Sequence, residues 1–181
     1  MKYYKQVQLK NGEMCTLRSP DREDAQEILN HMITTSDETD NMMRYCDEIT
    51  TTVEEEKEYL GGIEASRNAI MVSAVIDGKI VANAGINPVH ECEKCRHRAD
   101  LGISIQRDYW GLGLGTHIMT AIFEAARQAG YAQIELSVVT DNERAISLYK
   151  KFGFQIFGTN EKAFRSRSGK YQALHLMFCV L

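Results

Sequence analysis

The most constraining feature of this sequence is a glycine-rich segment that joins a β-branched run to an apolar helical pattern. Residues 103–116 read ISIQRDYWGLGLGT, with glycines at Gly111, Gly113 and Gly115. Glycine lets the backbone approach a ligand closely, and the free N–H groups at a helix start attract anions. A strand, a turn and a helix in this order favour an α/β fold that binds a pyrophosphate. A turn that only needs small residues for packing would give the same pattern.

Two common phosphate-binding motifs do not match this segment. A P-loop ends in Gly-Lys-Ser/Thr, whereas Gly115 is followed by Thr116 and His117. A dinucleotide fingerprint needs G-x-G-x-x-G, and counting from Gly111 and Gly113 places Thr116 where the third glycine should stand. Neither of these folds is therefore predicted.

The pattern of the N-terminal half predicts a strand, two helices and a hairpin. A short strand is expected over residues 15–18, and Ser19-Pro20 favours a helix start that leads into a helix over about 21–34. Thr51-Thr52 with the following glutamates predicts a capped second helix to about Ala65. Strands over 70–76 and 80–86 flank Asp77-Gly78, a dipeptide typical of a type I′ hairpin turn.

The C-terminal half predicts alternating strands and helices. The expected elements are a strand over 99–106, a helix from Gly115 to a cap at Gly130, a strand over 134–139, a helix from Asn142 to Gly153, and strands over about 154–163 and 171–180. The order βααβββαβαββ predicts an α/β fold with a mixed, mostly antiparallel sheet flanked by helices. No linker or repeat interrupts the chain, so residues 1–181 are expected to form a single domain.

A second motif lies downstream, where residues 142–154 read NERAISLYKKFGF. Together with the glycine-rich turn it resembles the paired coenzyme A-binding motifs of the Gcn5-related N-acetyltransferase (GNAT) superfamily. That family has a Q/R-x-x-G-x-G/A turn after its fourth strand and an N-x-x-A-x-x-L-Y helix that ends in Gly-Phe. The residues in register are Asn142, Ala145, Leu148, Tyr149, Gly153 and Phe154. The resemblance covers about residues 70–180 in element order.

One residue departs from the family pattern. Trp110 stands three residues before Gly113, where the family has a glutamine or arginine that contacts the pyrophosphate. That side-chain contact is lost, although most of the family's phosphate site is made of backbone N–H groups. Arg107 is a candidate replacement for the charge, and a solvated loop position is the alternative interpretation of Arg107.

The resemblance implies acetyl-coenzyme A (acetyl-CoA) as co-substrate. The pantetheine arm would pair with the exposed backbone of the fourth strand, opposite Val138 and Val139, and a backbone N–H near Ile103 would polarise the thioester carbonyl. The cofactor-binding residues implied in this way are Ile103, Ser104, Ile105, Trp110, Gly111, Leu112, Gly113, Leu114, Gly115, Thr116, Asn142 and Ala145.

The resemblance also implies two catalytic residues. Tyr149 matches the tyrosine that commonly protonates the departing thiolate, and a packed aromatic residue is the alternative. Asp100 lies near the position at which many relatives have a glutamate that deprotonates the amine through water, and an ordinary surface acid is the alternative. His90 and His97 lie upstream and are further candidates for the base.

An acidic segment between residues 37 and 58 lies where the family binds its acceptor. Asp37, Glu38 and Asp40 are the candidate substrate-binding residues. An acidic wall attracts a cation, so the expected acceptor is a cationic amine such as a polyamine, an aminoglycoside or a protein lysine. The alternative is a solvated helix face, since capping alone explains Glu54 and Glu55.

Net charge, hydropathy and cysteine content limit the partners and the cellular location that are expected. The net charge is −4 and no long basic run occurs, which argues against a nucleic-acid partner. No apolar run approaches the length of a membrane span, and no secretory signal is recognised, so no membrane partner and a cytoplasmic location are expected. Five cysteines with no export signal are expected to be free thiols.

Other interpretations remain open at this point. The loop from His90 to His97 contains Cys92 and Cys95, but structural zinc sites usually combine two separated ligand pairs, so no metal is expected there. A non-catalytic acyl-CoA-binding sensor on the same fold is the main rival function, and a larger acyl group is another. Exchange of the last two strands between subunits could produce a homodimer.

Overall fold

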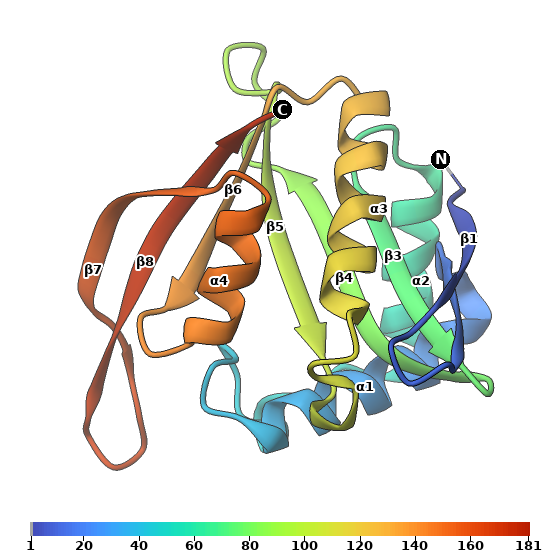
Figure 1. Cartoon of the computed structure of the whole chain (residues 1–181), viewed down its shortest axis with the longest axis horizontal. Helices are drawn as coiled ribbons and strands as arrows, with labels where there is room; N and C mark the ends of the chain where they lie inside the picture. Colours follow the sequence, from blue (N-terminus) through green and yellow to red (C-terminus); the bar gives the residue numbers. More distant parts are fainter. Residues whose placement is uncertain (1) are drawn as a thin grey trace.

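The computed structural model describes residues 2–181 and contains one eight-stranded sheet in the order β1-β2-β3-β4-β5-β6-β8-β7 (Figure 1). The strands are β1 (Tyr4–Gln8), β2 (Met14–Arg18), β3 (Ile70–Ile76), β4 (Lys79–Pro88), β5 (Arg98–Ile105), β6 (Gln133–Val139), β7 (Gln155–Arg165) and β8 (Tyr171–Val180). The α-helices are α1 (Ala25–Glu38), α2 (Val53–Ala65), α3 (Leu114–Gln128) and α4 (Glu143–Lys151).

The sheet is mixed and mostly antiparallel, as predicted. Among the strand pairings of residues 2–181, only that of β5 with β6 is parallel, and α3 makes the crossover between these two strands. Helix α4 then leads from β6 to β7, and β8 inserts between β6 and β7 with antiparallel pairing on both sides.

Helices cover both faces of the sheet. Helices α1 and α2 lie behind the sheet in the view of Figure 1, and α3 and α4 lie in front of it. The larger core cluster is formed by α3 and the sheet, with Leu114, Ile118, Met119 and Ile122 fully buried. A smaller cluster joins Ile28 of α1 and Leu60 of α2 to β3 and β4. Within residues 2–181, no helix has both the length and the apolar character needed to cross a bilayer.

The predicted element order was wrong at the N-terminus, because β1 was missed. The observed order is ββααβββαβαββ. Strand β1 lies at the edge of the sheet and buries only Val7, so its sequence lacks the alternating apolar pattern on which strand prediction depends. Its loop to β2 is nevertheless important, because the Lys10 amide donates to the Leu112 carbonyl at 3.0 Å and ties the loop to the glycine-rich turn.

The first helix also differs from its prediction. A short 3-10 turn over Arg22–Asp24 precedes α1, and Asp21, rather than Ser19, caps it by accepting from the Glu23 amide. Helix α1 continues to Glu38, four residues beyond the predicted end. The Thr34 and Thr35 hydroxyls donate to helix carbonyls, so these polar residues are accommodated within the helix beyond the last apolar position of the pattern.

Several local predictions are confirmed. Thr52 and Glu55 form the capping box of α2. Asp77 and Gly78 have φ values of 48° and 79°, as a type I′ hairpin requires. Gly130, with φ 83°, follows the end of α3.

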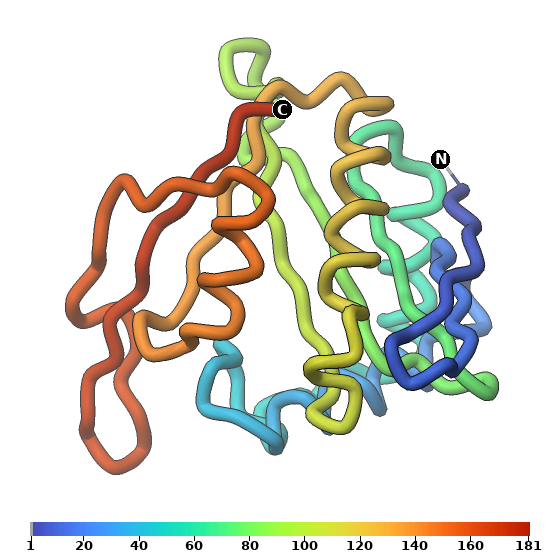
Figure 2. The backbone as a smooth tube through the Cα atoms, viewed as in Figure 1, coloured from blue at the N-terminus to red at the C-terminus, as the bar shows by residue number. Residues whose placement is uncertain are grey.

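Strands β5 and β6 separate soon after they begin to pair. They pair only at Arg98–Gln133, Ala99–Ile134 and Asp100–Glu135. Beyond this point β5 stays with β4 as far as Ile105, while β6 stays with β8 as far as Val139. The tube in Figure 2 shows the two segments diverging behind α4. The backbone of β5 facing this gap therefore lacks a strand partner.

Candidate active site

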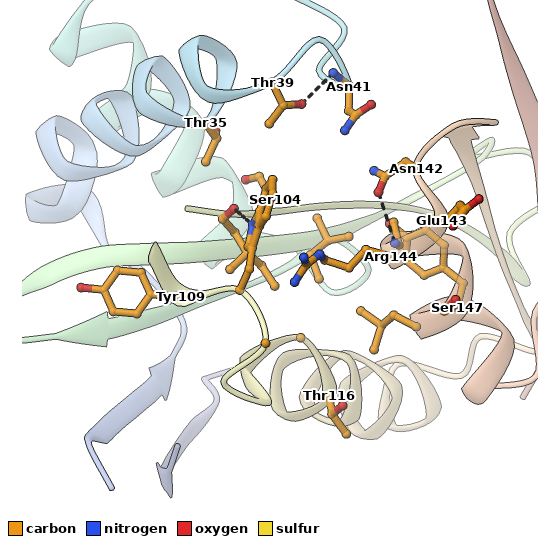
Figure 3. Close-up of a pocket in the computed structure, with 18 of the residues that line it drawn as sticks. Thr35, Thr39, Asn41, Ser104, Tyr109, Thr116, Asn142, Glu143, Arg144 and Ser147 are labelled. Carbon is orange, nitrogen blue, oxygen red and sulfur yellow. Dashed lines mark hydrogen bonds between the residues drawn. The ribbon is translucent and has the colours of Figure 1, made fainter. Parts of the chain in front are cut away.

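A cavity of about 690 Å³ lies where β5 separates from β6 and where α3 and α4 begin (Figure 3). It brings together most of the residues predicted to bind the cofactor. Those that line it are Ile103, Ser104, Ile105, Trp110, Gly111, Gly113, Gly115, Thr116, Asn142 and Ala145. Leu112 and Leu114 do not line it, because Leu114 is fully buried in the core and Leu112 packs against that core.

The glycine-rich turn has the backbone shape that the sequence predicted. Gly111 and Gly113 have φ values of 79° and 89°, which strain any residue with a Cβ, and Gly113 is the N-cap of α3. A Cβ added to Gly115 would lie 2.9 Å from Leu148 Cδ2, so this glycine allows α3 and α4 to approach closely. The first-turn amides of an α-helix have no acceptors within the helix. The turn therefore fits a pyrophosphate group.

Trp110 has a structural role at this turn. Its indole Nε1 donates to the Ile105 carbonyl at 2.7 Å, which anchors the ring beside the end of β5. The Arg144 guanidinium lies 4.9 Å from the ring centroid, in cation–π contact. Arg107 also approaches the ring, at 5.7 Å, but it donates to the Glu38 carbonyl and does not line the cavity.

The positive charges at the cavity come from residues that the sequence analysis did not select. Arg144, Lys10 and Lys151 line it, and Figure 3 shows the Arg144 side chain pointing into its centre. Arg144 lies within the second motif, directly before Ala145, so its place in the motif was the available signal. Lys10 belongs to the loop after β1, a strand that was not predicted, and no sequence motif marks Lys10 as a cavity residue.

Tyr149 lines the same cavity from α4. Its ring packs against Phe154 with centroids 5.7 Å apart, and burial raises the pKa of the phenol well above its ordinary value. Among residues 2–181 its hydroxyl has no hydrogen-bond partner, and it is not one of the fully enclosed polar groups. A protonated phenol O–H is therefore available to a ligand.

Asp100 lies outside the cavity lining, three residues before Ile103 on β5. Its neighbour across the parallel pair is Glu135, which forms an ion pair with Arg98. Asp100 lies exposed on β5, but nearby protein atoms partly desolvate its carboxyl, and this desolvation, followed by the charge of Glu135, raises the pKa of Asp100. The Arg98 guanidinium lowers the pKa of Glu135. His90 and His97 do not line the cavity.

The three acids proposed for substrate binding also lie outside the main cavity. Asp40 lines a smaller cavity of about 190 Å³ between the segment after α1 and the β7–β8 hairpin, together with Arg44 and Arg165. The Glu38 carboxylate accepts from the Arg107 amide at 2.8 Å. Asp37 accepts from the Cys46 thiol at 3.5 Å.

The cysteines are free thiols, as predicted. All five are unpaired: Cys15, Cys46, Cys92, Cys95 and Cys179. Across the described part of the chain, no group of three or more histidine, cysteine, aspartate or glutamate side chains is arranged to hold a metal ion.

Comparisons with known proteins agree with this geometry. The family model described as "Acetyltransferase (GNAT) family" matches residues 25–154, which is more than half of the chain. The L-amino acid N-acetyltransferase AaaT of Escherichia coli is 34% identical over 105 residues, covering 58% of this chain and 64% of that protein. The chain spans less than two thirds of the length of the first curated relatives it matches.

Solved structures match over more of the chain. An acetyltransferase of the GNAT family from Streptococcus pneumoniae has a TM-score of 0.88 and 32% identity, covering 92% of this chain and 99% of that one. A putative acetyltransferase from Salmonella typhimurium, solved with its cofactor acetyl-CoA, has a TM-score of 0.81 at 16% identity, covering 92% of this chain and 94% of that one. The second likeness is one of fold.

Proposed function

The chain belongs to the acetyltransferase (GNAT) family, and on that premise we propose that it is an acetyl-CoA-dependent N-acetyltransferase that acts on a primary amine. The observation that carries this proposal is one cavity lined by the glycine-rich turn, the unpaired edge of β5 and the Tyr149 phenol. The Escherichia coli relative is named as an L-amino acid N-acetyltransferase, which supports the same class of reaction.

The cavity offers distinct groups for binding and for proton transfer. Acetyl-CoA, when bound, supplies an acyl thioester. The amides at the start of α3 would hold its pyrophosphate, and Arg144 and Lys10 would add positive charge. The amine nitrogen bonds to the acyl carbon as the carbon–sulfur bond breaks. Tyr149 provides the proton that the sulfur needs, and Asp100 accepts the amine proton through water.

Asp100 is compatible with this role, although it stands back from the cavity. Desolvation, followed by the charge of Glu135, raises the pKa of the Asp100 carboxyl, and a carboxylate with a raised pKa is a stronger base towards the amine proton. The distance along β5 from Asp100 to Ile103 is about 10 Å at the usual rise per strand residue, so one or more waters would have to connect Asp100 with the amine.

The first test is thermal unfolding with and without acetyl-CoA. At about 100 times the dissociation constant, binding adds roughly 2.7 kcal/mol. For a domain of this size that raises the melting temperature by about 5–10 °C. No shift at millimolar acetyl-CoA would contradict the proposal.

Measuring the release of free thiol in the presence of an amine distinguishes an enzyme from a non-catalytic sensor. A sensor would bind acyl-CoA but release no thiol. Tyr149→Phe is expected to lower kcat roughly 100-fold while the thermal shift is retained. Tyr59→Phe is the matched control, because Tyr59 lies exposed on α2 and does not line the cavity. Equal kcat values for the two variants would remove Tyr149 from the mechanism.

The class of acceptor is tested by neutralising, one at a time, an acidic and a basic residue that line the smaller cavity. If the acceptor is a cationic amine attracted by Asp37, Glu38 and Asp40, then Asp40→Asn raises KM for a polyamine such as spermidine. If the acceptor carries a carboxylate beside its amine, as an L-amino acid does, Arg165→Gln raises KM for that substrate instead. Unchanged KM values in both variants would place the acceptor elsewhere.

A further inference from the structure

Helix α1 carries a buried histidine that faces the cavity-lining strand. His31 is 1% exposed, and its Nε2 lies 2.8 Å from the Ser104 hydroxyl oxygen on β5. Its other ring nitrogen, Nδ1, lies 3.4 Å from the Gln106 amide nitrogen. Ser104 itself lines the cavity. These three residues therefore form a chain of polar contacts that begins in the core and ends at the candidate active site.

The Gln106 side-chain amide determines which groups donate and which accept in these polar contacts. Its nitrogen donates to the Ile80 carbonyl at 3.2 Å, and an amide nitrogen only donates. The same nitrogen faces His31 Nδ1, so Nδ1 is the ring nitrogen that accepts. A neutral imidazole has one hydrogen, and it must then reside on Nε2. His31 therefore donates to Ser104.

The ring is neutral under ordinary conditions. Burial lowers the pKa of His31 from 6.5 to about 4, while the backbone carbonyls of Ile80 and Ser104 act in the opposite direction. At neutral pH the imidazole thus has a single hydrogen, and the assignment above applies.

The consequence concerns the Ser104 hydroxyl hydrogen. A serine hydroxyl has one hydrogen to donate and can accept at its oxygen. The oxygen accepts from His31, and within residues 2–181 it has no other hydrogen-bond partner. Its hydrogen is therefore free for an acceptor in the cavity.

We propose that Ser104 donates a hydrogen bond to the carbonyl oxygen of the acyl group bound in this cavity, and that His31 and Gln106 are positioning residues that fix the direction of that bond. The inference rests on the proposed acetyl transfer. The carbonyl oxygen gains negative charge as the amine attacks, and a preorganised donor stabilises that charge. Ser104 would add to the backbone N–H near Ile103 that the family resemblance implies.

The first experiment reads the tautomer without any substrate. Two-bond ¹⁵N–¹H NMR spectra of the free protein distinguish a histidine protonated at Nε2 from one protonated at Nδ1, and His31→Gln assigns the signal. We expect His31 to be protonated at Nε2 in the wild type, with a weaker preference in Gln106→Ala. Protonation at Nδ1 would overturn the inference, because Ser104 would then donate to the ring.

The second experiment measures acetyl-CoA-dependent thiol release. Ser104→Ala is expected to lower kcat roughly 10²–10³-fold, the usual effect of losing one such donor, while the acetyl-CoA thermal shift is retained. Ser104→Thr keeps the hydroxyl and should recover part of the rate. Ser73→Ala is the matched control, since this buried strand serine donates to Asn83 instead.

The outcomes separate this inference from the proposed function. A Ser104→Ala kcat within threefold of the wild type, in a folded protein, would overturn the role of Ser104 and leave the acetyltransferase proposal standing. A wild-type protein that neither binds acetyl-CoA nor releases thiol would overturn both.

Discussion

At the scale of single residues, Arg144 supplies positive charge at the cavity, where Trp110 has replaced the family's pyrophosphate-contacting glutamine or arginine. Trp110 occupies the place of the family's glutamine or arginine, yet its ring supports Arg144, whose guanidinium lies 4.9 Å from the ring centroid. The cation is thus supplied from α4 instead of the turn. A guanidinium over an indole ring is attracted by the ring's negative face, so this contact favours the position of Arg144 beside the cavity.

Arg144→Gln is therefore expected to weaken acetyl-CoA binding roughly 10- to 100-fold, because a hydrogen bond to a charged group contributes roughly 1.5–3 kcal/mol. The loss should shrink as salt is raised. Arg127→Gln makes the same charge change on α3, where the side chain lies over Phe123. Titration calorimetry of both variants gives the comparison, and equal dissociation constants would exclude a phosphate contact by Arg144.

At the scale of elements, the start of α3 is defined by backbone conformation. Gly113 is the N-cap with φ 89°, and an added Cβ would meet only the flexible Lys10 side chain at 3.7 Å. The cost of a larger residue there thus comes mainly from backbone strain and little from collision. The glycine pattern predicted this turn because a positive φ is a local steric requirement that glycine meets without strain.

Gly113→Ala should lower the free energy of unfolding by about 1–2 kcal/mol and weaken acetyl-CoA binding. Gly62→Ala is the matched control, because Gly62 lies inside α2 with open space around it and needs no positive φ. There alanine should raise stability by about 0.5–1 kcal/mol. Urea denaturation of both variants measures the sign of each change in the free energy of unfolding. A decrease in both variants would contradict the argument from backbone conformation.

At the scale of the whole molecule, the net charge of −4 does not describe the site. Arg144, Lys10 and Lys151 converge on one cavity although acids outnumber bases in the chain. A local field depends on which charges the fold brings together, so an acidic protein can bind a polyanionic ligand.

The buried His31 also links global stability to pH. The ring has a pKa of about 4 in the folded protein against 6.5 as its ordinary value. Between these values the unfolded chain binds more protons, so stability rises with pH there. The contribution is fully present above about pH 6.5 and is lost as pH falls towards 4. A gap of about 2.5 between the two pKa values corresponds to roughly 3 kcal/mol.

Urea denaturation at pH 4.5 and 7 should therefore show a smaller pH dependence in His31→Gln than in the wild type. His90→Gln is the control, because His90 lies exposed in a loop. Parallel pH profiles for the wild type and His31→Gln would contradict the buried neutral ring.

By itself the sequence determined what depends on neighbours along the chain. The Asp77-Gly78 hairpin, the Thr52–Glu55 capping box and the glycines before α3 follow from local sterics and hydrogen bonding, and they appear as predicted. The two motifs also predicted the family, and most of the residues predicted from them to bind the cofactor line the cavity, because each motif shapes a short continuous segment.

Only the tertiary structure decided which distant side chains meet. His31 and Ser104 are 73 residues apart, and no local pattern relates them. The position of Asp100 outside the cavity follows from where β5 and β6 separate, and the position of Lys10 follows from the edge strand β1. Such contacts depend on strand register and helix packing, which are properties of the whole sheet, so a reading along the chain could not provide them.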